Sequence, residues 1–244
     1  MAVISNVMRV KLILFAVICF ILWEALRTVP SLSSITNAGP ATLDRGGLVS
    51  LRTPLSPVEV AVYYEALCPD SRSFITRQLL PAFLKGPGLI NPVLIPYGKA
   101  ETRETPTGYE FTCQHGPVEC QGNKVHACAA AIIGSKEMQV KYVACMISNN
   151  MNPEEIGERC ATKLGIAWDP ILQCSRAREG NELLKANGDA TYALNPSVSF
   201  IPTITLNGNQ GNQAAILKNL FGEVCNLYPE PKPAECEYER KPSE

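Results

Sequence analysis

The chain has 244 residues, of which 46% are hydrophobic and 18% charged, and its formal net charge at pH 7 is −1. This composition excludes disordered and fibrous proteins, and the length suits one domain with additions or two small domains. A net charge so close to zero gives no reason to expect nucleic acid or an anionic membrane surface as a partner.

The N-terminal segment has the features of a secretory signal. Arg9 and Lys11 precede a short apolar run, Leu12–Trp23. Because this run is short for a bilayer span, we predict a signal peptide over residues 1–38, cleaved somewhere in 28–38. An uncleaved signal anchor is the alternative, which the short run disfavours. No later apolar run is long enough for a span, so no membrane contact is expected after cleavage.

The next segments predict a loose arm followed by regular structure. Residues 39–57 are rich in Gly, Pro, Ser and Thr and lack a period, which indicates a linker or loose arm. Val58–Glu65 alternates apolar side chains on one face and is predicted to be a strand. Val93–Tyr97 is predicted to be a second strand.

A helix is predicted between these two strands. Pro81 is expected to kink or end it, and Gly86-Pro87-Gly88 closes it. Its apolar face comprises Ile75, Leu79, Leu80, Phe83 and Leu84. Strand, helix and strand together form the βαβ opening of a thioredoxin-like fold.

The middle of the chain is predicted to be a helical insertion over about residues 100–198. Residues 100–122 contain turn residues without a strong period. Helices are plausible over Lys124–Ile133 and Glu137–Ser148. The signals for two more are an Asn152-Pro153 start with a Gly165 stop, and an Asp169-Pro170 start with a Gly180 stop.

The sheet is predicted to resume near the C-terminus. The segment SFIPTITLNGNQ, residues 199–210, indicates a strand with a tight turn at Asn207-Gly208. A final amphipathic helix is expected around Leu217, Leu220, Phe221 and Val224. We therefore predict an α/β fold, with a thioredoxin-like domain over residues 58–228 and a C-terminal tail over 229–244.

Cys68 is the leading candidate for chemistry. It lies where the first strand ends and a helix begins, and a helix N-terminus stabilises a thiolate, the form of cysteine that attacks disulfides. Ser71 stands where a dithiol enzyme has its second cysteine. A hydroxyl cannot resolve a mixed disulfide, but it can donate a hydrogen bond to the thiolate. The alternative for Cys68 is a buried structural cysteine or one half of a disulfide. Ser71 is also a residue that helix N-termini favour, which is compatible with its proposed role.

A proline is the third element of the candidate site. Ile201-Pro202 directly precedes the predicted strand TITLNG. In thioredoxin-like folds a cis-proline at this place faces the active cysteine, and the backbone beside it pairs with the substrate. Ile201 and Pro202 are therefore predicted to bind substrate, with a cis bond inferred from the fold alone. An edge-strand proline is the alternative.

The cysteine count supports secretion. Of the 10 cysteines, Cys19 lies in the predicted signal, which leaves an odd number. In an oxidising compartment most of these should be paired. At least one thiol must then be free or bonded to another molecule.

Both histidines of the chain lie in its densest motif, CQHGPVECQGNKVHAC, residues 113–128. Cys113-x-His115 and His126-x-Cys128 could form a zinc site. Secretion favours disulfides, however, and these spacings are not a common zinc pattern, so no metal is predicted.

The same segment resembles the signature of the gamma-interferon-inducible lysosomal thiol reductase family. That signature is Cys-Gln-His-Gly, two residues, Glu-Cys, two residues, Asn, four residues and Cys. Its fixed positions are all met here, by Cys113, Gln114, His115, Gly116, Glu119, Cys120, Asn123 and Cys128. The resemblance extends from about Val58 to Cys236 and includes YYEALCPDS, IPYGKA and PTITLNG.

The resemblance implies a thioredoxin-like fold that reduces protein disulfides. Cys68 matches the first active cysteine of the family, and Ser71 replaces the second. The signature cysteines are carried over as disulfide partners and not as catalysts. With Cys68 set apart, eight cysteines remain for four bridges of unknown pairing: Cys113, Cys120, Cys128, Cys145, Cys160, Cys174, Cys225 and Cys236.

The predicted function is thiol–disulfide exchange on protein disulfides through Cys68. An external thiol such as glutathione would resolve the mixed disulfide, and no metal, nucleotide or flavin is implied. The alternatives are a non-catalytic peptide- or protein-binding protein, as in host defence, and a dimer linked through Cys68.

The predicted location is extracellular or the endolysosomal lumen. The outside is favoured because no N-glycosylation sequon occurs, Asn195-Pro196-Ser197 being disqualified by its proline.

Overall fold

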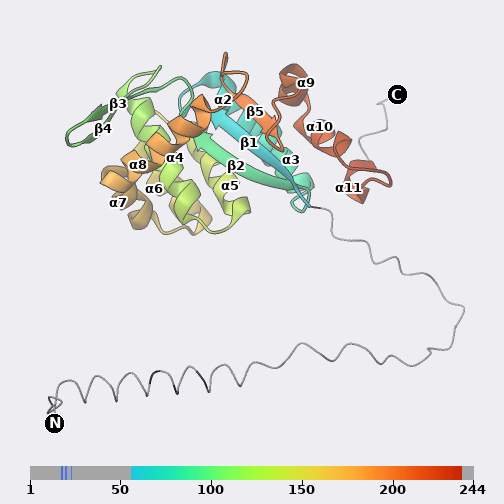
Figure 1. The fold of residues 1–244 in the computed structure, drawn as a ribbon, viewed down its shortest axis with the longest axis horizontal. Coiled ribbons are helices and arrows are strands. Elements are labelled where there is room, and N and C mark those ends of the chain that lie inside the picture. Colours follow the sequence, from blue (N-terminus) through green and yellow to red (C-terminus); the bar gives the residue numbers. More distant parts are fainter. Residues whose placement is uncertain (1–17, 19, 21–22, 24–55, 238–244) are drawn as a thin grey trace, which may run out of the picture. The chain divides into compact units, whose positions relative to one another are not determined.

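The computed structural model describes residues 56–237, together with Ile18, Phe20 and Trp23, which are helical (Figure 1). The chain divides into two compact units, Met1–Leu51 and Arg52–Glu244. The rest of the predicted signal, most of the predicted arm and the last seven residues of the tail lie outside the described residues. None of the described helices is long and apolar enough to cross a membrane.

The central sheet has three strands, β1 (Val58–Tyr64), β2 (Ile90–Pro96) and β5 (Thr203–Leu206). Their order is β2-β1-β5, with β2 parallel and β5 antiparallel to β1 (Figure 1). The strand predicted at Val58–Glu65 is confirmed, and β2 begins earlier than predicted. Because Tyr63 pairs with Thr203, the end of β1 lies beside the start of β5.

Both faces of this sheet are covered. On one face, four side chains of β1 enter the main hydrophobic core: Val58, Val60, Val62 and Tyr64. On the other face, Ala61, Tyr63 and Ile95 pack against Ala190 and Leu194. Two buried faces explain why β1 is apolar along almost its whole length.

The helix after β1 runs without interruption from Pro69 to Lys85 in three parts: α2 (Pro69–Phe74), a π-helical turn η1 (Ile75–Leu79) and α3 (Leu80–Lys85). The prediction was that Pro81 kinks or ends this helix, and the helix does not end there. Proline lacks an N–H and crowds the carbonyl four residues earlier. The preceding turn is widened, and the Leu80 N–H donates to the Ile75 carbonyl five residues back, which accommodates the proline.

The wide turn also changes which residues face the core. Ile75, Leu79 and Phe83 are buried as predicted, but Leu84 is 50% exposed. A π-helical turn adds one residue to the helical repeat and rotates the residues that follow it. Leu84 is thereby moved off the predicted apolar face.

Between β2 and β5 lie one hairpin and five helices. The hairpin strands are β3 (Glu101–Thr105) and β4 (Gly108–Thr112), in a region where the sequence predicted no regular element. The helices are α4 (Pro117–Ile132), α5 (Lys136–Ile147), α6 (Pro153–Leu164), α7 (Trp168–Arg176) and α8 (Arg178–Tyr192). Gly165 ends α6 in a left-handed conformation, as predicted.

The helix stop predicted at Gly180 is wrong. The break lies at Ala177, whose backbone is extended, and Gly180 belongs to the first turn of α8. A Cβ at Gly180 would lie 2.6 Å from the carbonyl oxygen of Cys174. This glycine therefore permits close approach of α7 and α8.

The C-terminal segment follows the prediction with one change. Asn207 and Gly208 both have positive φ, at 49° and 79°, as a tight hairpin turn requires. The single final helix is instead two, α9 (Gln213–Lys218) and α10 (Leu220–Asn226). Asn219 divides them and caps α10 by accepting the Gly222 N–H. A short helix, α11 (Ala234–Glu237), follows.

Four disulfides pair eight cysteines: Cys113–Cys120, Cys128–Cys174, Cys145–Cys160 and Cys225–Cys236. The second joins α4 to α7 and the third joins α5 to α6. Among the described cysteines, only Cys68 is free. Since Cys113 and Cys128 are both in disulfides, neither can act as a thiolate ligand of zinc.

Candidate active site

Cys68 is the N-cap residue of α2. It has extended backbone geometry (φ −65°, ψ 124°), and Pro69 takes the first helical position. Its sulfur accepts the backbone N–H of Ser71, with 3.5 Å between nitrogen and sulfur. The cysteine thus holds the place that a polar capping side chain usually takes, where helix N–H groups favour a negative charge.

The segment around the proline reaches the same sulfur from the other side. The Ile201–Pro202 peptide is cis and directly precedes β5. The Cys68 thiol donates to the Ile201 carbonyl, with 3.8 Å between sulfur and oxygen. The fold thereby brings Cys68, Ser71, Ile201 and Pro202 together, as the sequence predicts. Cys68 itself is only 8% exposed.

The hydroxyl of Ser71 has a different partner from the one expected. The side chain is fully buried, and its oxygen accepts the backbone N–H of Glu65 at 3.3 Å. The donor to the Cys68 sulfur is therefore the backbone of residue 71. A capped helix end aims its free amides at the capping atom, which explains this arrangement.

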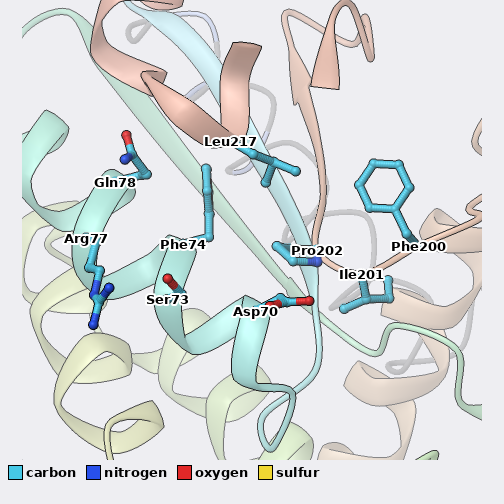
Figure 2. Close-up of a pocket in the computed structure, with 9 residues that line it drawn as sticks. All are labelled: Asp70, Ser73, Phe74, Arg77, Gln78, Phe200, Ile201, Pro202 and Leu217. Carbon is cyan, nitrogen blue, oxygen red and sulfur yellow. The ribbon is translucent and has the colours of Figure 1, made fainter. Parts of the chain in front are cut away.

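An open pocket of about 420 Å³ lies beside the site (Figure 2). Its walls come from the helix that begins at Pro69, from the proline segment and from α9: Asp70, Ser73, Phe74, Arg77, Gln78, Phe200, Ile201, Pro202 and Leu217. Phe200 is 39% exposed although it is a large apolar residue. Only Ile201 and Pro202 of these were predicted. An aromatic residue next to the predicted proline was the signal for Phe200.

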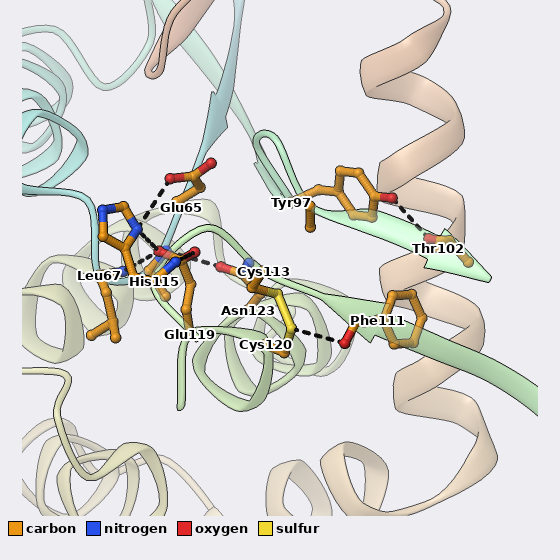
Figure 3. The surroundings of a disulfide bond; sticks show 12 residues. Glu65, Leu67, Tyr97, Thr102, Phe111, Cys113, His115, Glu119, Cys120 and Asn123 are labelled. Carbon is orange, nitrogen blue, oxygen red and sulfur yellow. Dashed lines mark hydrogen bonds and ion pairs between the residues drawn. A yellow bond between two sulfur atoms is a disulfide. The ribbon is translucent and has the colours of Figure 1, made fainter. Parts of the chain in front are cut away.

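Two side chains of α4 hold the segment ahead of Cys68 (Figure 3). The Asn123 amide oxygen accepts the Ala66 N–H at 2.9 Å, and the Glu119 carboxylate accepts the Leu67 N–H at 3.3 Å. Both side chains are fully buried. The family-like signature is thus part of the site's support, a role that sequence reasoning missed.

His115 joins this support from the loop before α4. The disulfide between Cys113 and Cys120 ties that loop to the first turn of the helix. The His115 N–H donates to Glu119 Oε1 at 3.0 Å, and His115 Nδ1 lies 2.6 Å from Glu119 Oε2. Nδ1 also lies 3.4 Å from Glu65 Oε2 (Figure 3). Burial raises the pKa of Glu65 above its ordinary value, and the charge of Glu119 adds to this.

His126 is structural in this arrangement. It is fully buried, and its Nδ1 lies 3.0 Å from the Tyr64 hydroxyl. Burial lowers the pKa of His126 to about 3, so the ring is neutral at physiological pH.

The sequence of this chain is similar to one family of known proteins. Residues 59–164 match the family described as gamma interferon inducible lysosomal thiol reductase (GILT). A protein of that name from Carassius auratus is 37% identical over 188 residues, covering 74% of this chain and 72% of its own. GILT-like protein 1 of Drosophila melanogaster is 35% identical over 207 residues, covering 78% of this chain and 82% of its own.

Among solved structures, DsbA of Chlamydia trachomatis is similar with a TM-score of 0.50 and 14% sequence identity. The match covers 78% of this chain and 98% of that one. At this identity the likeness concerns the fold alone. It confirms the predicted thioredoxin-like architecture.

Proposed function

This chain belongs to the gamma-interferon-inducible lysosomal thiol reductase family, and on that premise we propose that it is a thiol–disulfide oxidoreductase acting on protein disulfides through the single cysteine Cys68. The observation that carries the proposal is one unpaired thiol at a helix N-terminus beside a cis-proline. The other described cysteines are all in disulfides, so none of them competes for this role.

The first step is attack by the Cys68 thiolate. At rest the thiol donates to the Ile201 carbonyl; once its proton is lost, the Ser71 N–H and the α2 N-terminus stabilise the sulfur anion. The thiolate attacks one sulfur of a substrate disulfide. A new bond to Cys68 forms, the substrate S–S bond breaks, and the other substrate sulfur leaves as a thiolate that takes up a proton.

Resolution requires a thiol from outside the site. Ser71 cannot attack the mixed disulfide, so an external thiol such as glutathione attacks the Cys68 sulfur and releases the reduced substrate thiol. A second external thiol then frees Cys68, and the two external thiols leave joined as a disulfide. Where a second substrate cysteine attacks instead, the result is isomerisation of the substrate. Neither route draws on a metal, nucleotide or flavin.

The pocket suggests how a substrate chain is held. Phe74, Phe200 and Leu217 offer apolar surface, while Asp70 and Arg77 place opposite charges at its margin. An extended segment with an apolar side chain near its cystine would fill the pocket and present sulfur to Cys68. The backbone next to Pro202 would pair with that segment.

Turnover of a protein disulfide in excess glutathione tests the proposal. Wild type should form a reductant-sensitive adduct and reduce the substrate, whereas Cys68→Ser should do neither. Wild type alkylated at Cys68 is the matched control, because its fold is made before the thiol is blocked, and it should behave like the variant. Equal rates for wild type and Cys68→Ser would reject the single-cysteine mechanism.

Non-catalytic binding is the second candidate, favoured by an open pocket beside a site that lacks its own resolving thiol. It predicts that partner capture survives Cys68→Ala and is insensitive to reductant. A covalent adduct that is lost in Cys68→Ala rules it out. Non-reducing electrophoresis of the same proteins shows whether a dimer is linked through Cys68.

The proposed location is outside the cell or the endolysosomal lumen. Four disulfides suit an oxidising compartment. The absence of an N-glycosylation sequon from the sequence favours the outside over glycan-dependent sorting to lysosomes. Expression of the full chain followed by assay of medium and lysosomal fractions distinguishes the two.

A further inference from the structure

Three side chains at the end of β1 form a cluster that thiol exchange does not use. They are Glu65, directly after the strand, His115 in the loop before α4, and Glu119 in the first turn of α4. One ligand atom from each lies within 4.8 Å of the others. Figure 3 shows the two carboxyl groups and the imidazole turned toward one another.

The cluster sets two buried carboxyl groups against one imidazole. The Glu65 and Glu119 side chains are 1% and 0% exposed, and among the described residues His115 is the only ion-pair partner of either. Lys99 reaches Glu65 through its backbone N–H, and its side chain forms no described ion pair with either carboxylate. A cation bound between the two buried carboxyl groups would stabilise the charged form of both.

One carboxylate oxygen also lacks a hydrogen bond. Glu65 Oε1 accepts the Lys99 N–H at 2.8 Å, but Oε2 is buried without any hydrogen-bond partner among the described residues. It points at His115 Nδ1, 3.4 Å away. Buried carboxylate oxygens ordinarily find a donor or a metal ion. This oxygen is therefore independent evidence for a missing ligand at the cluster.

We propose that Glu65, His115 and Glu119 form a binding site for a divalent transition-metal cation of the zinc class. Imidazole and carboxylate suit such ions, whereas calcium and magnesium prefer sites made of oxygen alone. Ligands at about 2.1 Å from a tetrahedral ion lie roughly 3.4 Å apart. Glu65 and His115 already have this spacing, and the contact between His115 and Glu119 would open by less than about 1 Å when the ion replaces their proton.

The ion would act on the support of Cys68 and not on its chemistry. His115 is 35% exposed in its side chain, which provides an entry path from solvent. Glu119 also accepts the Leu67 N–H, one residue before Cys68, so a bound ion would tie β1, α4 and this segment together. The site rests on this geometry and stands apart from the proposed function.

Zinc binding by titration calorimetry at neutral pH tests the site. The full tag-free chain carries Cys19→Ser and Cys68→Ser, because a free thiol is itself a zinc ligand. We expect saturable binding of one ion per chain and a rise in melting temperature. His115→Ala and Glu65→Gln should each weaken zinc binding by about 10-fold or more. Magnesium alone should give neither signal.

The variants are chosen so that they should still fold, and a loss of zinc binding is then not a consequence of misfolding. His115 is partly exposed, and Gln at position 65 keeps an acceptor for the Lys99 N–H. Glu110→Gln, an exposed carboxylate of β4, is the matched control and should bind zinc as the parent does. Absence of saturable zinc binding, or unchanged binding in both His115→Ala and Glu65→Gln, would overturn the proposal. Activity is not the readout, so the result is separate from the fate of the thiol mechanism.

Discussion

The backbone N–H of Ser71 points at the sulfur of Cys68, with 3.5 Å between the two atoms. This contact comes from the main chain, so it does not depend on the side chain at position 71. Stabilising the Cys68 thiolate and resolving its adduct are therefore separable by mutation. In this chain the backbone of Ser71 can stabilise the thiolate, but the side chain of Ser71 cannot resolve the adduct.

Ser71→Ala should leave attack by Cys68 nearly unchanged. The variant keeps the backbone donor but removes the oxygen that accepts the buried Glu65 N–H. We expect a loss of about 1 kcal/mol in the free energy of unfolding. Quenched-flow trapping of the adduct and urea unfolding measure the two effects. A collapse in adduct formation with an intact fold would mean that the hydroxyl is the donor that matters.

Ser71→Cys should restore internal resolution. A thiol three residues after Cys68 can attack the mixed disulfide, and intramolecular attack should shorten the life of the adduct on the order of 10-fold or more. The adduct would be replaced by a disulfide between positions 68 and 71, detectable by mass spectrometry after acid quenching. Ser73→Cys is the control, since its thiol lies two residues further along the helix and should leave the adduct long-lived. Similar adduct lifetimes in both variants would contradict the expected geometry.

Local patterns were enough to predict several elements. The apolar alternation of Val58–Glu65 is a signal contained in a few neighbouring residues. The same holds for the glycine that ends α6, Gly165. The β3–β4 hairpin was missed because most of its side chains are exposed or partly exposed, so the strands have no apolar period. Leu84 was misplaced because a π-helical turn, itself dependent on nearby Pro81, rotates the helix.

Only those site residues that belong to recognisable sequence motifs could be predicted as a site. Cys68 and Pro202 each carry a recognisable local setting, and the fold brings both to one place. Glu65 has no such pattern, and the signature that contains Glu119 does not indicate that Glu65 is its neighbour. Glu65 follows a strand, and Glu119 lies at the start of a helix more than 50 residues later. Only tertiary packing shows that the two carboxylates share a buried space.

Asn123→Ala should destabilise the protein and loosen the segment ahead of Cys68. It leaves the buried Ala66 N–H without its acceptor, which costs about 1–3 kcal/mol. Urea unfolding measures this loss, and hydrogen exchange at Ala66 shows whether it is local. Asn149→Ala, at an exposed asparagine, should change stability by less than about 0.5 kcal/mol. Equal losses in the two variants would show that Asn123 does not support the segment.

The disulfides should differ in their contribution to stability. Cys128 and Cys174 are 46 residues apart, whereas Cys113 and Cys120 are 7 apart. A longer closed loop restricts the unfolded chain more, so replacing both cysteines by alanine should cost about 4 kcal/mol for the first pair and about 2 kcal/mol for the second. Denaturant unfolding of the two double variants measures the order. The reverse order would mean that native packing around each bridge outweighs loop length.

His126 should make the protein less stable in acid. Its pKa is about 3 in the folded chain and near 6.5 in the unfolded chain, so the unfolded chain binds the proton first as pH falls below 6.5. Between these values folding stability declines with falling pH, and at pH 5 the loss from this group is about 2 kcal/mol. Burial raises the pKa of Glu65, which acts in the opposite direction.

Comparison with His126→Asn isolates this effect, because Glu65 contributes equally to both proteins. The variant has no titrating ring beside Tyr64, so its loss of stability between pH 7 and pH 5 should be smaller by about 2 kcal/mol. Urea unfolding at both pH values measures the difference, and His115→Ala controls for the other histidine. If wild type and His126→Asn lose the same stability over this range, the buried ring is not the group that the unfolded chain protonates.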